Sequence, residues 1–141
     1  MNVAEQIERF EGRRCQAYRD TLGKWTIGVG HCSSDVHEGA EWTDSQVSYQ
    51  LARDIENATL ACRHMLPWFD ALNEPRQAVL IGMCFQLGIT GLLGFHGTLD
   101  AIRDEHFADA AEHMRQSKWA QQTPNRVRVL AAQMDSGEWQ A

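Results

Sequence analysis

The chain has 141 residues, of which 43% are hydrophobic and 23% are charged, and its formal net charge at pH 7 is -6. This length and composition predict one globular domain with a hydrophobic core. Lysine and arginine form no cluster, which argues against nucleic acid as a partner, because binding to phosphates requires grouped cations. No apolar run reaches the ~20 residues of a membrane span, so neither a signal peptide nor stable membrane insertion is expected. We expect a monomer that needs no metal or other cofactor.

The cysteines are spaced too far apart to form a CxxC pair. A chain made in the cytosol keeps its thiols reduced, so free thiols are expected at Cys15, Cys32, Cys62 and Cys84. The dipeptide His31-Cys32 and the triplet Cys62-x-His64 contain zinc-ligand residue types. Structural zinc sites, however, usually use ligand pairs with two to four intervening residues. We therefore favour small buried or half-buried thiols over a zinc site.

The first predicted element is a short amphipathic helix over residues 2–11. Val3, Ile7 and Phe10 recur at helical spacing and share one face. Gly12 follows as a helix stop, which places Glu11 in the last helical turn.

A β-hairpin is predicted next, with strands over residues 17–20 and 25–30 around a turn at 21–24 that contains a glycine. In the second strand, apolar residues alternate with a face that carries almost no side chains. Glycine lets another chain approach the backbone closely, so we interpret this face as a surface for a bulky polymer. Its residues are Thr26, Gly28 and Gly30.

The rest of the chain is predicted to be helical after a polar loop over residues 31–42. Thr43 and Gln46 form a capping box that begins a long amphipathic helix ending near residue 65. Further helices are predicted over 78–88, 98–105, 107–117, and from Pro124 to about Gly137. The predicted fold class is α+β and mostly helical.

Two carboxylates, Glu11 and Asp20, flank the predicted hairpin. A pair of carboxyl groups across a cleft is what glycosidic bond cleavage requires. The negative end of a helix dipole disfavours an ionised Glu11, as a general acid needs, whereas Asp20 beside a turn is expected to stay solvated and charged. Thr26 offers a hydroxyl that could hold a water beside Asp20. From composition and spacing alone, two solvated surface carboxylates are the favoured interpretation, because such pairs are common by chance.

Three separated blocks of the sequence resemble one enzyme family. The first contains Glu-Gly, then Tyr-x-Asp, then Gly-x-x-Thr-Ile-Gly-x-Gly-His, and spans residues 11–31. The others are FQLGITGLLGF at 85–95 and WAQQTPNR at 119–126. Together they are similar to the signatures of the phage-type lysozymes, glycoside hydrolase family 24, and most closely to its T-even bacteriophage members.

The resemblance implies an activity and a fold. It implies a muramidase that cleaves peptidoglycan between N-acetylmuramic acid and N-acetylglucosamine with inversion, using Glu11 as general acid and Asp20 with Thr26 to activate water. It implies one lysozyme-like domain with a small lobe at about 12–42 and a connecting helix at about 43–65. The helical lobe would comprise residues 66–141 together with the N-terminal helix.

Further residue roles follow only from the resemblance. Phe85 and Gln86 match residues that line the sugar cleft. Three residues occupy substrate-groove positions where the T-even enzyme carries other residue types, and these are Cys32, Thr98 and His113. Two residues are implied to support the site. His31 would pair with an aspartate of the long helix, and Asp54 is the candidate for that aspartate. Arg126 would lie close to the catalytic acid.

Several alternatives stay open on the sequence. An endolysin without an export signal would stay in the host cytoplasm until a holin lesion in the membrane releases it to the wall. The same enzyme could serve as a bacterial effector. A lytic transglycosylase on a similar fold is a rival enzyme, although it would not need Asp20 and Thr26. A peptidoglycan-binding module without turnover is the rival that is not an enzyme.

Overall fold

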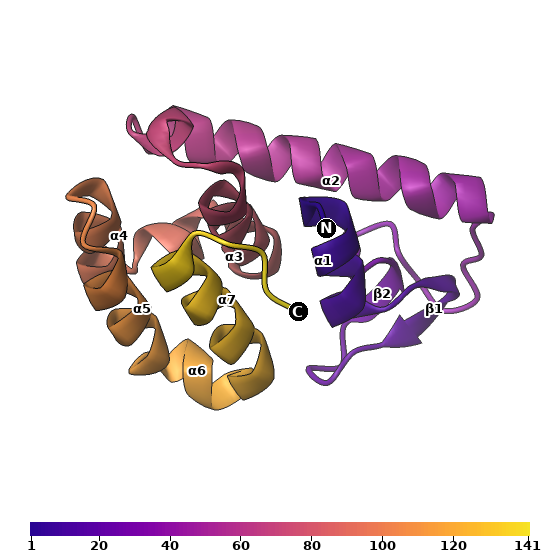
Figure 1. The fold of residues 1–141 in the computed structure, drawn as a ribbon. Helices are drawn as coiled ribbons and strands as arrows, with labels where there is room; N and C mark the ends of the chain where they lie inside the picture. The colour runs from indigo at the N-terminus through magenta and orange to yellow at the C-terminus, as the bar shows by residue number, and fades with distance from the viewer. The chain divides into compact units, whose positions relative to one another are not determined.

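The computed structural model describes all 141 residues and contains seven α-helices, one short 3-10 helix and one two-stranded antiparallel sheet (Figure 1). The expected α+β, mostly helical fold class is therefore confirmed. The chain divides into two compact units. We call residues 4–57 the hairpin unit, and residues 58–141 with Met1–Val3 the helical unit.

The hairpin unit contains helix α1 (Val3–Glu11), strands β1 (Arg14–Arg19) and β2 (Trp25–Gly28), and the first part of helix α2 (Asp44–Met65). Except for its first residue, α1 is grouped with this unit. Side-chain pairing gives a physical reason. The Arg13 guanidinium lies 2.8 Å from a carboxylate oxygen of Glu8 on α1 and 2.8 Å from one of Asp44 on α2.

Strand β2 ends two residues earlier than predicted. Within the hairpin, Tyr18 pairs with Thr26, and the register is irregular between Arg14 and Tyr18. Beyond Gly28 the chain turns back, because the backbone groups of Ile27 and His31 exchange two hydrogen bonds of 2.9 Å. The turn uses left-handed backbone at Gly28 and Gly30, with φ of 68° and 64°. The expected strand over 25–30 is thus a shorter strand followed by a tight turn.

The loop and the long helix that follow match the sequence analysis. No helix forms between β2 and α2, as expected for the polar loop. At the start of α2, the Thr43 amide donates to Gln46 Oε1 over 2.7 Å, and the Gln46 amide donates to Thr43 Oγ1 over 3.1 Å. This reciprocal pair is the predicted capping box, and it satisfies two amides that the helix itself leaves without partners.

The helical unit consists of a 3-10 turn (Phe69–Ala71) and five further helices. These are α3 (Glu74–Leu93), α4 (His96–Arg103), α5 (Phe107–Arg115), α6 (Lys118–Gln122) and α7 (Pro124–Ser136). Within this unit, α5 packs against α4 and α7 (Figure 1). The five-residue helix α6 was not predicted, and α3 continues past the predicted end. Gly88 interrupts α3 with a φ of 75°.

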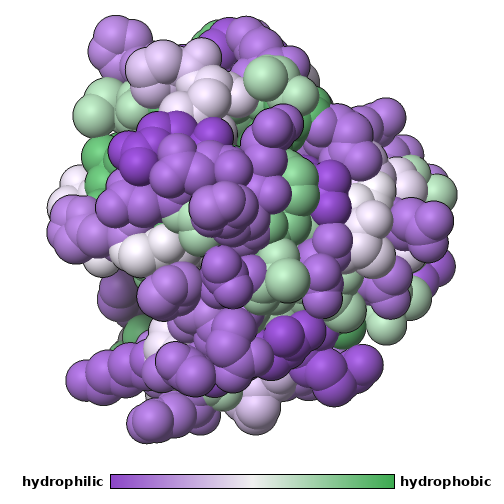
Figure 2. Space-filling model, turned by 60° about the vertical axis from the view of Figure 1, so that its left-hand side comes forward, coloured by the Kyte–Doolittle hydropathy of each residue, from purple (hydrophilic) through white to green (hydrophobic).

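Helix α3 supplies much of the core of the helical unit. Its length and apolar composition are sufficient for a membrane span, contrary to the expectation from apolar runs, although the core helix of a soluble protein passes the same test. Val79, Leu80 and Met83 are completely buried. Burial within the unit therefore accounts for much of the apolar character of α3. Hydrophilic residues cover most of the face drawn in Figure 2, with hydrophobic residues visible between them.

The end of α7 is fastened to the start of α3. The Arg76 guanidinium donates to the carbonyl oxygens of Met134 and Asp135, each over 2.8 Å, and stacks 3.6 Å from the centre of the Phe107 ring. Asn73 Nδ2 donates to the carbonyl of Gly137 over 3.0 Å. We call these contacts of Asn73 and Arg76 the α3–α7 clamp. They satisfy carbonyls that the end of α7 leaves without helical partners.

The four cysteines are all free, as expected for reduced thiols. Cys15 and Cys32 are exposed in the hairpin unit, whereas Cys62 and Cys84 are buried in the helical unit. A hydrogen bond with the Cys84 thiol, together with burial, raises the pKa of the Cys62 thiol. Cys62 also donates to the carbonyl of Leu80 over 3.6 Å.

Candidate active site

Glu11 is the last residue of α1, and its carboxyl group lies directly against Gly30. A β-carbon placed on Gly30 would stand 2.8 Å from Cδ and 3.0 Å from Cγ of Glu11, closer than real side chains approach. Gly30 therefore serves two purposes, since it adopts the left-handed backbone of the turn and leaves room for the carboxyl group.

The second glycine of the turn has a different neighbour. A β-carbon on Gly28 would lie 3.1 Å from the Trp42 ring and 3.6 Å from Val47. The space beside each glycine is thus occupied by a side chain of the protein. The expectation that these glycines form a bare strand face for a polymer is wrong, because the chain turns there and its own residues cover both positions.

Asp20 is fixed at the tip of the hairpin by its own turn. Its Oδ1 atom accepts hydrogen bonds from the backbone amides of Leu22 at 2.9 Å and Lys24 at 2.8 Å. The Asp20 backbone also pairs with Lys24 and Gly23. The other oxygen, Oδ2, accepts no hydrogen bond from the protein. The side chain is therefore held in one orientation with one oxygen available to a water or a ligand.

Thr26 stands opposite Tyr18 in the hairpin register, and only 4% of its surface is exposed. Its hydroxyl donates to the carbonyl of Lys24 over 3.1 Å. Because that bond uses the only hydroxyl hydrogen, Oγ1 can act toward a further group as an acceptor. A role of this hydroxyl in orienting a water molecule stays a prediction.

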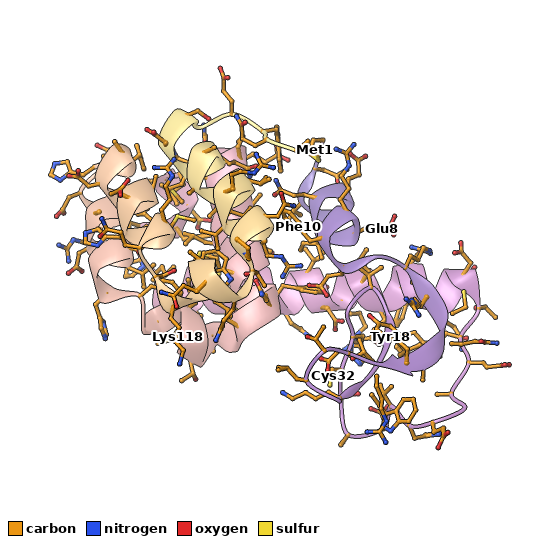
Figure 3. All side chains as sticks on the ribbon, turned by 90° about the horizontal axis from the view of Figure 1, so that it is seen from below. Met1, Glu8, Phe10, Tyr18, Cys32 and Lys118 are labelled. Atoms are coloured by element: carbon orange, nitrogen blue, oxygen red, sulfur yellow. The ribbon has the colours of Figure 1, made fainter.

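Tyr18 lies on β1 in the hairpin unit (Figure 3), and the charges of both candidate carboxylates act on it. Burial raises the pKa of Tyr18, and the negative charges of Glu11 and Asp20 raise it further, against the opposing charge of Arg14. Tyr18 and Asp20 are two residues apart, so strand alternation places them on one face. Sequence reasoning did not select Tyr18, although it belongs to the Tyr-x-Asp motif and the same alternation could have identified it.

His31 and Asp54 form the pair that the resemblance implied, with His31 Nδ1 2.7 Å from Asp54 Oδ2. Gln50 donates to the other carboxylate oxygen of Asp54 over 2.8 Å. The remaining ring nitrogen of His31 lies 3.2 Å from the Ser33 hydroxyl, which in turn donates to Asp35 and lowers the pKa of that carboxyl. This network ties the loop after β2 to α2.

Cys32 follows His31 directly and is exposed. Its thiol is therefore accessible from solvent within the hairpin unit. Any contact of Cys32 with a substrate stays a prediction.

Four candidate residues lie on helices of the helical unit. Gln86 on α3 accepts a hydrogen bond from the indole of Trp119 over 2.9 Å, which fixes its amide, and Phe85 beside it is half-buried. His113 is exposed and packs against Gly97. Thr98 is only 3% exposed, so it offers almost no surface to a ligand in this conformation.

Arg126 lies in the first turn of α7, in the helical unit. Its proximity to Glu11 of the hairpin unit stays a prediction from the resemblance. The structure contains no group of three or more His, Cys, Asp or Glu side chains arranged to hold a metal ion. The zinc-ligand residue types noted in the sequence are therefore not gathered into one site.

Comparisons with known proteins agree with the resemblance. The model of the phage lysozyme family matches residues 8–134. The probable T4-type lysozyme 1 of Dictyostelium discoideum is 25% identical over an alignment that covers 96% of this chain and 95% of the relative.

Two phage proteins contain a similar region within a longer chain. The pre-baseplate central spike protein Gp5 of Enterobacteria phage T4 is 32% identical over 90% of this chain, which corresponds to 26% of that protein. The peptidoglycan hydrolase gp36 of Pseudomonas phage phiKMV is 29% identical over 94% of this chain and 15% of its own length. Since the family model spans almost the whole sequence, the chain belongs to the phage lysozyme family.

Proposed function

We propose that this lysozyme hydrolyses the bond between N-acetylmuramic acid and N-acetylglucosamine in bacterial peptidoglycan, with inversion at the anomeric carbon. Glu11 donates the proton to the leaving oxygen, and Asp20 with Thr26 positions and activates the attacking water. The observation that supports this most is that both carboxylates belong to the hairpin unit, where Glu11 packs against Gly30 after β2 and Asp20 is held by two amide hydrogen bonds at the hairpin turn. Two carboxyl groups in one compact unit fit the requirement of a two-acid glycosidase.

The different surroundings of the two carboxylates support different roles. Glu11 ends α1 and packs against Gly30. Asp20 accepts two amide hydrogen bonds through one oxygen, and its other oxygen accepts none from the protein. A base held in this way can align a water, whereas an acid at a helix end can deliver a proton.

The test is product analysis. Purified peptidoglycan is digested with the wild type and with Glu11→Gln, and the fragments are analysed by mass spectrometry. Reducing muramic acid ends from the wild type alone would support the proposal. Fragments lighter by one water, with an anhydro end, would instead identify a lytic transglycosylase. A protein that pelleted with the walls but released nothing would be a wall-binding module.

The biological role that we propose is that of an endolysin. The enzyme would accumulate in the host cytoplasm as a monomer and reach the wall after a separate membrane lesion. A bacterial effector would use the same chemistry. Expression from the native genome with and without induced lysis, followed by fractionation, would distinguish the two.

A further inference from the structure

The hairpin is cationic although the protein as a whole is acidic. Residues 13–25 contain four cations, Arg13, Arg14, Arg19 and Lys24, and one carboxylate, Asp20, in a chain of net charge -6. A local excess of positive charge beside a candidate catalytic carboxylate is not required for folding, so it calls for a functional explanation.

The cations of the hairpin differ in whether they are already neutralised. Arg13 is paired with Glu8 and Asp44. Arg14 is exposed, and its side chain makes neither an ion pair nor a hydrogen bond. Its guanidinium instead lies over the Tyr18 ring, 4.5 Å from the centroid. Stacking on a ring supports the guanidinium plane and leaves its N–H donors free for a planar anion.

The position of Arg14 is the second part of the argument. Tyr18 pairs directly with Thr26, and directly paired residues of an antiparallel hairpin project to the same face. Asp20, two residues after Tyr18, is on that face too. Arg14 therefore stands on the face of the hairpin that carries the proposed water-activating residues. Arg19 stacks on Trp25, 4.7 Å from that ring, and this pair belongs to the opposite face.

We propose that Arg14, supported by the Tyr18 ring, is a substrate-binding residue that takes a carboxylate of the muramyl unit. This inference rests on the proposed function. Muramyl units carry carboxylates either on the lactyl group, where no peptide is attached, or on the stem peptide. The guanidinium donates paired N–H hydrogen bonds to such a carboxylate, and its positive charge offsets the repulsion that Glu11 and Asp20 exert on an anionic polymer.

The test compares Arg14→Gln with Arg19→Gln, a matched loss of one stacked, exposed guanidinium from the other face. Each is assayed on intact peptidoglycan and on the same material after its carboxyl groups are amidated with carbodiimide and excess methylamine. On intact walls, Arg14→Gln should lower kcat/KM about tenfold, mainly through KM, because a charge-assisted hydrogen bond is lost. Arg19→Gln should stay within about twofold, and Arg14→Lys should recover part of the loss.

Amidation should reduce the wild type to the level of Arg14→Gln while leaving that variant almost unchanged. A third substrate, glycan freed of peptides by an amidase, retains only lactyl carboxylates. If Arg14→Gln still lowers activity on this glycan, the bound carboxylate is that of the lactyl group. If the loss disappears, the bound carboxylate is that of the stem peptide. Equal losses in Arg14→Gln and Arg19→Gln, or an Arg14 effect that survives amidation, would overturn the proposal.

A binding measurement tests the role of Arg14 independently of the proposed hydrolysis. Soluble muramyl peptides are titrated by calorimetry into Glu11→Gln and into Glu11→Gln combined with Arg14→Gln, so that no turnover is needed. About tenfold weaker binding in the double variant supports the role of Arg14, even if the wild type released no reducing ends. Unchanged binding would contradict the role of Arg14 while leaving hydrolysis intact. Thermal melting of each variant excludes an effect of misfolding.

Discussion

The carboxyl group of Glu11 occupies the space in which a side chain at Gly30 would begin. The two residues are far apart in the sequence, and the tight turn after β2 brings them together. The glycine thus leaves room for the side chain of the proposed general acid.

Gly30→Ala is expected to displace Glu11 and to reduce activity on peptidoglycan by at least ~100-fold, since small misplacements of reacting groups have effects of that size. The left-handed backbone adds a stability loss of roughly 1–2 kcal/mol. Gly39→Ala is the control, because Gly39 has a φ of 85° but open space around its β-carbon position. It should lose similar stability and keep its activity. Comparable activity in the two variants would contradict the proposed contact.

Asp20 is expected both to stabilise the hairpin turn and to activate water, and two substitutions separate these roles. Asp20→Asn keeps an oxygen that can accept from the amides of Leu22 and Lys24, so melting should change little while kcat falls by roughly 10²–10⁴-fold. Asp20→Ala should lose activity and also about 1 kcal/mol of stability. An active Asp20→Asn enzyme would remove the water-activating role from this residue.

Tyr18 should make stability depend on alkaline pH. Its pKa in the folded protein is raised by burial and then by the charge of Glu11. The folded state therefore holds a proton that the unfolded state releases above about pH 10, so stability falls as the pH rises through that range. Urea denaturation at pH 9, 10 and 11 should show a steeper loss for the wild type than for Tyr18→Phe. Parallel pH profiles would show that Tyr18 does not contribute.

The thiols should fall into two classes of reactivity. Cys15 and Cys32 are exposed, whereas Cys62 and Cys84 are buried. Because a buried, protonated thiol is a poor nucleophile, an aromatic disulfide reagent should titrate two thiols quickly in the native protein and four in guanidinium. Mass mapping of alkylated peptides identifies them. Rapid native modification of Cys62 would contradict its burial.

Asp54→Ala should destabilise the loop after β2. The change removes the acceptor of His31 and of Gln50 at a site where the His31 and Asp54 side chains are 17% and 19% exposed. A loss of about 1–3 kcal/mol is expected from unsatisfied partners. Asp70→Ala breaks the exposed pair with Arg63 and should cost less than about 1 kcal/mol. Equal losses by chemical denaturation would show that the His31 network adds no stability.

Local sequence rules located the elements whose signals lie within them. The Thr43 and Gln46 capping box predicted the start of α2, and Pro124 predicted the start of α7. Helix α6 was not predicted, because five residues are too few to show a helical periodicity. The turn after β2 was not predicted either. It depends on backbone hydrogen bonds between Ile27 and His31, which the alternation of residue types does not reveal.

A sequence motif was enough to select the candidate residues of the site. Contacts that depend on irregular backbone could not be predicted from the sequence. Glu11, Asp20 and Thr26 stand in a recognisable pattern. Residues four apart in a regular strand are about 13 Å apart, so strand geometry gives no reason to pair Arg14 with Tyr18. The irregular register between them accompanies their stacking contact. The roles of the two glycines were also misjudged, because the side chains that cover them come from α1 and from the loop before α2.

The α3–α7 clamp has a mechanical consequence. Asn73 and Arg76 hold the carbonyls of Met134, Asp135 and Gly137, so a pull on the polypeptide beyond Gly137 would reach these hydrogen bonds before it could unwind α7. Force applied at that end would be carried into α3 and the buried interior of the helical unit. A fusion partner or surface tether attached beyond Ala141 would therefore pull on a reinforced point of the fold.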